Sequence, residues 1–212
     1  MTKYLRKEEI NDVTVIEISN ALKEGKLVVF PTDTVYGIGT NAYNEEACEK
    51  IYKVKGRPKN KPLLILISEI SMLKEIVDYI SPAEQKLIDA FWPGPLTITF
   101  KKREGVLPNV ILAGYTHIGI RLIKDGIIHD LIQTAGVPIV APSANISGNI
   151  TGTKIENIVK EFDCKVDYIL DYGDIESDIV STIVQVEDEK LLIIREGKIK
   201  KEELAKVLPL KK

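Results

Sequence analysis

Short aliphatic runs alternate along this chain with longer segments in which apolar residues recur at helical spacing. The runs with the length of buried strands are KLVVF (26–30), LLILI (63–67), HIGIRLI (117–123) and VPIVA (137–141). The segment SPAEQKLIDAF is typical of a helix, with Ser81 as N-cap, Pro82 at the first helical position and Glu84 closing a capping box. This alternation predicts an α/β or α+β domain.

Three other segments carry expectations that the structure can test. A helix is predicted to end at Gly25, and the residues expected on its buried side are Val13, Ile16 and Leu22. The stretch TDTVYGIGT that follows KLVVF reads as a polar, glycine-containing loop. The stretch LTITF (96–100) alternates apolar and polar residues, which predicts a half-exposed strand.

The length and composition predict one domain without a membrane segment. With 212 residues, of which 44% are hydrophobic, the chain can bury a substantial core. No apolar run approaches the roughly 20 residues needed to cross a bilayer, and the polar N-terminus is unlike a signal peptide. We therefore expect a cytoplasmic protein with no membrane partner. A formal charge of -2 also argues against attraction of nucleic acid to the whole surface.

The metal-binding residue types are too few and too scattered to predict a protein-built metal site. The chain has two histidines, His117 and His129, so a site built from several imidazoles is excluded. Cys48 and Cys164 lack the spacing of a metal site and are expected to be reduced thiols.

Positive charge is concentrated in the segment YKVKGRPKNKPLLILI (52–67). Its cations fall on every second residue, at Lys53, Lys55, Arg57, Lys59 and Lys61. Pro58 disfavours a helical conformation at Arg57, and side chains two apart in an extended chain point the same way. All but the first of the cations are therefore expected to form one charged row. Such a row is either a solvated loop that keeps the protein soluble or a local site for a phosphate chain.

Hydroxyl-bearing residues stand at the ends of several predicted strands. They are Thr32 and Thr34 after KLVVF, Ser143 with Asn145 after VPIVA, and Ser181 with Thr182 at the head of STIVQV. Open α/β sheets hold ligands in loops at strand ends, although a single Ser or Thr is more often a turn or cap residue. Neither a GxxxxGK[ST] loop nor a GxGxxG after a strand is present. A nucleotide would therefore have to be bound by cationic side chains and hydroxyls.

Two arginines belong to otherwise apolar strands. Arg121 lies within HIGIRLI, and Arg195 ends LLIIR. Arginine is seldom buried unless it is paired. Each is therefore either a surface or ion-paired residue, or a clamp for the carboxylate of a ligand. A nucleophilic triad is not predicted, because the sequence has no GxSxG and neither histidine has an evident Ser or Cys partner.

Several strings, taken together and in order, resemble the YrdC/Sua5 family of threonylcarbamoyl-AMP synthases. They are FPTDTVYGIG, KVKGRPKNKPL, FWPGPLT, IGIRL, APSANISG, STIV and IIREG, and the likeness covers about residues 10 to 200. The resemblance implies a YrdC-like twisted mixed α/β sheet, flanked by helices, around a large concave cavity. It also implies a single domain over 1–212, without the C-terminal domain of longer Sua5 proteins.

The activity implied by the resemblance is synthesis of L-threonylcarbamoyladenylate and pyrophosphate from L-threonine, bicarbonate and ATP. This reaction is the first step toward threonylcarbamoyladenosine at position 37 of tRNA. The implied cofactor is Mg²⁺, held mainly by the ATP phosphates rather than by protein ligands. The implied partners are a downstream transferase of the Kae1/TsaD type and tRNA or another RNA.

The family motifs imply roles for particular residues. Those implied to bind ATP are Arg57, Lys61, His117, Ser143, Thr151 and Arg195. Those implied to bind L-threonine are Thr34, Tyr36, Leu66, Arg121, Ala141 and Ser181. The catalytic set is Lys55, Arg57, Ser143 and Asn145. The sequence departs from the commoner pattern at Leu66, where many members have histidine, and at His117, where many have threonine.

Two other functions stay open at this point. One is a carbamoyl-transfer role like that of the related HypF domain, against which the lack of an acylphosphatase-like or zinc-finger extension argues. The other is an RNA-binding or ribosome-associated module that uses a cationic hollow. That module would bind RNA with a steep dependence on salt and would perform no adenylate chemistry.

Overall fold

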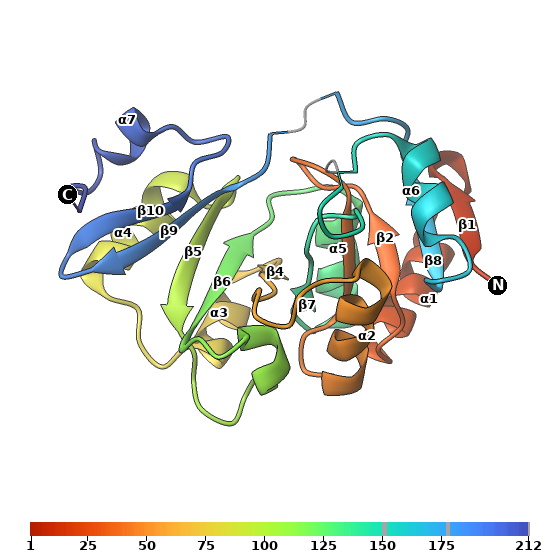
Figure 1. Cartoon of the computed structure of the whole chain (residues 1–212), viewed down its shortest axis with the longest axis horizontal. Helices are drawn as coiled ribbons and strands as arrows, with labels where there is room; N and C mark the ends of the chain where they lie inside the picture. Colours follow the sequence, from red (N-terminus) through yellow and green to blue (C-terminus); the bar gives the residue numbers. More distant parts are fainter. Residues whose placement is uncertain (150–151, 177–178, 212) are drawn as a thin grey trace.

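The chain folds into a mixed sheet covered by helices (Figure 1), in a computed structural model that describes residues 1–149, 152–176 and 179–211. The strands are β1 (Lys3–Arg6), β2 (Val28–Phe30), β3 (Gly37–Asn41), β4 (Ile65–Ile67), β5 (Leu96–Lys101), β6 (His117–Leu122), β7 (Ile139–Val140), β8 (Tyr168–Asp171), β9 (Thr182–Glu187) and β10 (Lys190–Arg195). The α-helices are α1 (Asp12–Lys23), α2 (Glu45–Lys55), α3 (Ile70–Ile76), α4 (Pro82–Phe91), α5 (Ile127–Ala135), α6 (Ile155–Phe162) and α7 (Lys201–Leu204). Short 3-10 helices are η1 (Lys7–Glu9) and η2 (Asn109–Leu112).

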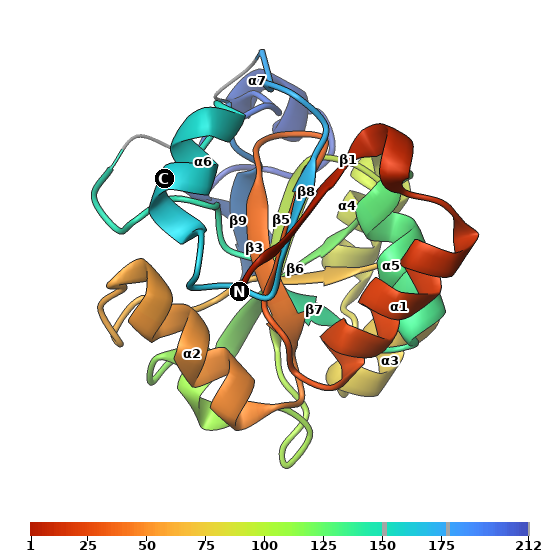
Figure 2. The ribbon, with the colours of Figure 1, turned by 90° about the vertical axis from the view of Figure 1, so that its right-hand side faces the viewer.

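The strands follow one another in the order β1-β8-β2-β3-β7-β4-β6-β5-β9-β10. Four neighbouring pairs are parallel, namely β1 with β8, β2 with β8, β4 with β6, and β5 with β9. The other pairs are antiparallel. Figure 2 shows α1, α3, α4 and α5 on one side of the sheet and α2 and α6 on the other. The predicted α/β class and the twisted mixed sheet flanked by helices are confirmed.

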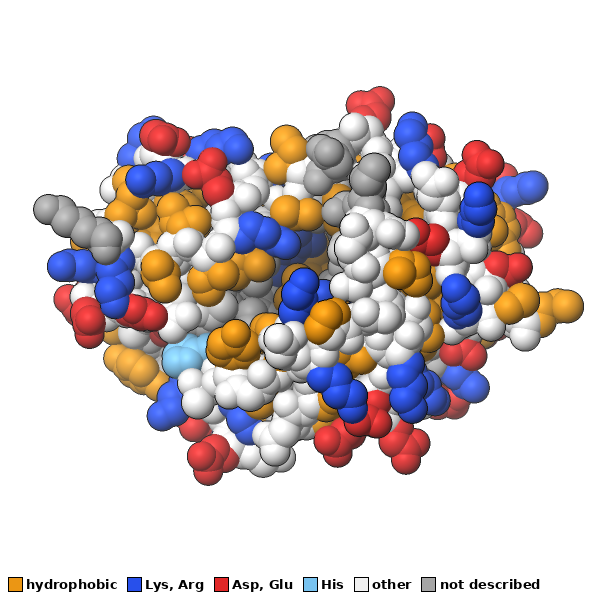
Figure 3. Space-filling model, in the orientation of Figure 1, with side chains coloured by type: hydrophobic (Ala, Val, Ile, Leu, Met, Phe, Trp, Pro, Cys, Tyr) orange, Lys and Arg blue, Asp and Glu red, His pale blue; other side chains and the backbone are white. Residues whose placement is uncertain are grey.

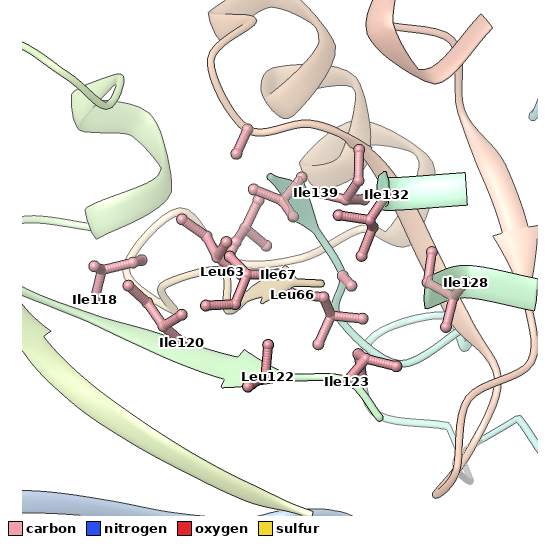
Figure 4. Close-up of a cluster of buried hydrophobic side chains, with 14 of the residues drawn as sticks. Leu63, Leu66, Ile67, Ile118, Ile120, Leu122, Ile123, Ile128, Ile132 and Ile139 are labelled. Carbon is pink, nitrogen blue, oxygen red and sulfur yellow. The ribbon is translucent and has the colours of Figure 1, made fainter. Parts of the chain in front are cut away.

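The centre of the sheet is buried on both sides. Figure 4 shows aliphatic side chains from β4, β6, β7 and α5 packed into one cluster. Its labelled members, all buried, are Leu63, Leu66, Ile67, Ile118, Ile120, Leu122, Ile123, Ile128, Ile132 and Ile139. This close packing makes the middle strands rigid. Side chains at the ends of these strands are consequently held in fixed positions, which is what a binding site requires.

Several local expectations are confirmed by the geometry of the helix ends. In α4 the Ser81 side chain accepts the backbone N–H of Glu84, and the Glu84 carboxylate accepts the N–H of Ser81. The helix predicted to end at Gly25 is α1, which ends at Lys23 and is followed by Gly25 with a φ of 87°. These ends depend on residues within four positions of one another, so they follow from the sequence alone.

Three expectations were wrong. Part of the predicted loop after β2 is strand β3, because Gly37, Ile38 and Gly39 pair with β2 and the following residues pair with β7. Val13 and Ile16 of α1 are 75% and 53% exposed.

Strand β5 is the third case, since it exposes only Lys101 to solvent and buries or half-buries the rest. Its polar face lines the cavity described below and does not face bulk solvent.

The loop after β10 is fastened to β9 through one buried hydroxyl. The Thr182 hydroxyl donates to the carbonyl of Ile199 at 2.7 Å and accepts the N–H groups of Gly197 and Ile199 at 2.9 and 3.0 Å. Thr182 is fully buried. This contact fixes the chain directly after Arg195, which lines the site described below.

Thr182→Val is therefore expected to lower the free energy of unfolding by about 1–3 kcal/mol, because valine leaves two buried N–H groups without an acceptor. Urea unfolding measures the change. Thr134→Val, at an exposed position on α5, is the matched control and should change stability by less than about 0.5 kcal/mol. Equal losses in the two variants would contradict the role given to Thr182.

Among the described residues, no helix has the length and apolar character needed to cross a membrane.

Candidate functional site

A small inner cavity of about 60 Å³ lies among the ends of the central strands. The residues that line it are Thr32, Thr34, Val35, Tyr36, Gly37, Leu64, Leu66, Arg121, Ala141, Ser143, Val180, Ser181 and Arg195. They come from the β2–β3 connection, β4, β6, the segment after β7 and the segment around β9 and β10. Strand ends that are far apart in sequence therefore meet around one hollow, as expected for an open α/β sheet.

A larger outer cavity of about 590 Å³ opens beside the inner one. The two share Leu64, Ser143 and Arg195, so they lie next to each other. The outer cavity is also lined by Arg57, His117 and apolar residues such as Ile183 and Ile194. Figure 3 shows a hollow near the middle of the same face, with Lys and Arg side chains in and beside it. The outer volume is within the range of small-molecule sites.

Three guanidinium groups surround this pair of cavities. Burial lowers the pKa of Arg57, of Arg121 and of Arg195, and the charges of Arg121 and Arg57 lower the pKa of Arg195 further. Arg195 therefore lies within electrostatic reach of both other cations. The described residues that line the two cavities include no Asp or Glu. Asp33 pairs with Arg121, but among the described residues no carboxylate pairs with Arg57 or Arg195, and this surplus of positive charge favours an anionic ligand.

Arg121 is the most deeply buried of these cations, with 3% exposure. Its Nη2 donates to Oδ1 of Asp33 at 2.7 Å, and its Nη1 donates to Oγ1 of Thr34 at 3.3 Å. The Nε atom is buried and has no hydrogen-bond partner within the part of the chain that the structure describes. The ion-paired interpretation is confirmed. Arg121 also lines the inner cavity, and the clamp for a ligand carboxylate stays a prediction.

Arg57 and Arg195 are held by backbone carbonyls, which leave their charge uncompensated. Arg57 donates from Nη2 to the carbonyl of Pro62 at 2.8 Å and from Nε to that of Lys61 at 3.2 Å. Arg195 donates through Nε and Nη2 to the carbonyl of Ser181, at 3.2 and 2.9 Å. Each guanidinium is thereby oriented without losing its net charge.

The predicted row of cations along the basic segment is wrong. Lys55 is the last residue of α2 rather than part of an extended strand, and its side chain is 1% exposed. Lys59 points away and forms an ion pair with Glu49 at 3.3 Å. The chain reverses at Gly56, where the left-handed conformation ends the helix. Within the described chain, Arg57 is the one cation of this segment that lines a cavity.

The segment after β7 forms a compact turn beside the cavities. The Ser143 hydroxyl donates to Oδ1 of Asn145 at 2.7 Å, and Nδ2 of Asn145 donates to the carbonyl of Asn149 at 2.9 Å. The N–H of Ala144 donates to the carbonyl of Tyr36 at 2.7 Å, which joins the turn to β3. Burial raises the pKa of Tyr36 to about 12. Its hydroxyl therefore stays protonated and donates to Gly173 at 2.8 Å.

Most of the residues predicted from sequence line the two cavities. Those at the inner cavity are Thr34, Tyr36, Leu66, Arg121, Ala141, Ser143, Ser181 and Arg195. Those at the outer cavity are Arg57, His117, Ser143 and Arg195. The predicted residues that line neither cavity are Lys55, Lys61 and Asn145. Thr151 lies outside the described residues.

Sequence reasoning missed one wall of the outer cavity. Thr97 and Thr99 of β5 line it side by side with Ile183 and Gln185 of β9. In the parallel pair Thr97 is the register partner of Ile183, and Thr99 is the partner of Gln185. The Thr97 hydroxyl also lies 3.0 Å from that of Ser181. The signal was present as period-two alternation in LTITF and STIVQV. That alternation indicates a polar face but does not say whether the face meets solvent or a cavity.

Comparisons with known proteins point to one family. The Sua5_yciO_yrdC family model, described as "Telomere recombination", matches residues 20–197. The chain is 39% identical over 208 residues to a putative threonylcarbamoyl-AMP synthase of Methanocaldococcus jannaschii, covering 96% of this chain and 97% of that protein. It is 36% identical over 202 residues to the threonylcarbamoyl-AMP synthase of Pyrococcus abyssi, covering 95% of this chain and 59% of that protein.

A solved structure has the same fold. The crystal structure of P. abyssi Sua5 complexed with L-threonine superposes with a TM-score of 0.91 at 34% identity, covering 100% of this chain and 62% of that chain. The chain therefore spans about three fifths of the length of the P. abyssi relative.

Proposed function

Because this chain belongs to the Sua5/YciO/YrdC family, we propose that it is a threonylcarbamoyl-AMP synthase. It joins L-threonine, bicarbonate and ATP to form L-threonylcarbamoyladenylate and releases pyrophosphate. The observation that supports this proposal most directly is that the two cavities adjoin each other. A small pocket with a buried guanidinium lies next to a larger one edged by two more, which suits a small amino acid beside a nucleotide.

The inner cavity suits the amino acid. Arg121 binds the α-carboxylate, because it is the most deeply buried cation that lines this cavity. Thr34 and Ser181 provide hydroxyls on the same wall. Leu66 gives an apolar surface to the side-chain methyl group. The similarity to the P. abyssi protein complexed with L-threonine supports threonine as this amino acid.

The outer cavity suits the nucleotide. Arg57 and Arg195 face the phosphates with charges that backbone carbonyls orient but do not neutralise. Ser143 lines both cavities, and we place it beside the reacting phosphorus. Apolar side chains such as Ile183 and Ile194 cover the base.

The chemistry needs alignment and charge neutralisation rather than a nucleophilic side chain. The threonine amine nitrogen forms a bond to the carbon of bicarbonate, a C–O bond breaks and water leaves, which gives a carbamate. An oxygen of this carbamate attacks the α-phosphorus of ATP. An O–P bond forms as the bond to the β-phosphate oxygen breaks, and pyrophosphate leaves with the electron pair. Positioned guanidinium groups stabilise the charge that develops on the departing phosphate. Enclosure of the cavity also shields the carbamate from water.

We propose that Mg²⁺ binds with ATP and is held mainly by the phosphates. Among the described residues, no group of three or more His, Cys, Asp or Glu could hold a metal ion. The described lining offers hydroxyls and guanidinium groups instead. That donor set fits a cation already ligated by phosphate oxygens, and the ion supplies charge neutralisation at the leaving group.

The product is an activated acyl adenylate, so a second enzyme must consume it. We propose a transferase of the Kae1/TsaD type as that enzyme, tRNA as the final acceptor, and the cytoplasm as the compartment.

The deciding experiment measures pyrophosphate release with each substrate omitted in turn. Release is expected only when ATP, L-threonine and bicarbonate are all present, because the attacking carbamate requires both of the last two. Release that does not depend on threonine would overturn the proposal. RNA binding with a steep salt dependence and no pyrophosphate release would favour the RNA-binding alternative instead.

A further inference from the structure

Lys55 is a buried cation that the proposed reaction does not use directly. It ends α2, is 1% exposed and lines neither cavity. Its Nζ is within hydrogen-bonding distance of the backbone carbonyls of Ser143 and Asn145, and lies 3.4 Å from Oδ1 of Asn145. A lysine is rarely buried without a strong reason, since removing an ammonium group from water is costly.

The backbone of the same residue reinforces this contact. The N–H of Ser147 donates to the carbonyl of Lys55 at 2.8 Å. Lys55 is thus joined to both ends of the segment Ser143–Ser147, once through its ammonium group and once through its carbonyl. Ser143 of this segment lines both cavities. An ammonium beneath the turn draws two carbonyl oxygens inward, away from the cavity where they would repel phosphate oxygens.

We propose that Lys55 is a positioning residue, whose buried ammonium group holds the turn Ser143–Asn145 in the shape that binds the nucleotide phosphates without touching them. This inference rests on the proposed function in taking ATP as the ligand. The positioning role explains why Lys55 lies two residues before Arg57 in the sequence and yet does not line either cavity.

Protonation of this group is coupled to the arrival of an anion. Burial, with a smaller contribution from the charge of Arg57, lowers the pKa of Lys55 from its ordinary value of 10.5 to about 7. Glu161 of α6 acts in the opposite direction. The turn contributes carbonyls and an amide at this position but no charged group. A phosphate bound at Ser143 adds nearby negative charge, which raises the pKa of Lys55.

The sign of the coupling follows directly. At pH 8 the free protein holds Lys55 mostly deprotonated, whereas the complex holds it more protonated. Nucleotide binding therefore takes up protons, and by linkage a fall in pH from 9 to 7 strengthens binding.

The experiment is isothermal titration of the protein with the Mg²⁺ complex of a non-hydrolysable ATP analogue at pH 8, in buffers of different ionisation enthalpy. Wild-type protein is expected to take up about half a proton or more per nucleotide. Lys55→Met should weaken binding by about 10- to 100-fold and abolish the uptake. Lys55→Arg keeps a charge that cannot be removed, so it should bind the analogue with no proton uptake.

Control variants distinguish a failure of the positioning role of Lys55 from a failure of the proposed function. Lys53→Met removes an exposed lysine two residues earlier in the same helix and should leave both affinity and uptake unchanged. If Lys55→Met does not fold, the wild-type and Lys55→Arg measurements still decide. Proton uptake that persists in Lys55→Arg, or none in the wild type, overturns the inference. Failure of the wild-type protein to bind the analogue at all counts against the proposed function instead.

Discussion

Arg121→Ala is expected to weaken the binding of L-threonine by about 100-fold or more. Arg121 is 3% exposed, lines the inner cavity and is held in place by Asp33 and Thr34. A carboxylate bound there is removed from water. Solvent therefore cannot replace the interaction that is lost with the Arg121 guanidinium. Titration calorimetry with L-threonine measures the effect.

The same experiment contains its own specificity test. Arg121→Lys retains one positive charge but loses the planar fork of donors, and should recover only a small part of the affinity. Binding of the ATP analogue should change much less than binding of threonine, because the outer cavity retains Arg57 and Arg195. Arg103→Ala, which removes an ion pair with Asp78 outside both cavities, is the matched control. Unchanged threonine affinity in Arg121→Ala would contradict the assignment of the inner cavity as the L-threonine site.

Arg57→Ala is expected to lower the rate of pyrophosphate release by about 100- to 1,000-fold while the protein stays folded. Two backbone carbonyls aim this guanidinium at the outer cavity, and no acid neutralises it among the described residues that line that cavity. Charge that develops on the departing pyrophosphate would then lack one of its two guanidinium partners. The measurement is the rate at saturating substrates, compared with the far-UV spectrum and unfolding curve of each variant.

Lys59→Ala is a stringent control for this effect. Lys59 lies two residues beyond Arg57 in the same basic segment, and the sequence pattern predicted one shared row for both. In the structure Lys59 is exposed and pairs with Glu49. The rate should therefore stay within about twofold of wild type, since a surface ion pair contributes little. A loss as large as that of Arg57→Ala would instead support the continuous charged row.

The resemblance identified from ordered sequence motifs is confirmed by the family match over residues 20–197. The motifs identified the family because they coincide with the ends of strands, where the side chains of a binding site come together. The capping box of α4 and the end of α1 before Gly25 were likewise predictable. Such features depend on bonds that span three or four residues.

What the sequence could not determine is the direction in which individual side chains point. The burial of Lys55 depends on Ser143 and Asn145, 88 and 90 residues away along the chain. The pairing of Arg121 with Asp33 joins residues separated by 88 positions. Period-two spacing correctly predicts which residues of β5 share a face, but only the packing of β9 beside it decides that this face lines a cavity.

The amino-acid sequence by itself thus determined several of the central strands, the capping of α4 and the set of polar residues grouped at strand ends, since these follow from local hydrogen bonding and hydrophobic periodicity. Only the tertiary structure decided which cations face the cavities and which support them from behind. The physical reason is that burying a charge is favourable only where its partners converge, and those partners come from segments that only the folded sheet brings together.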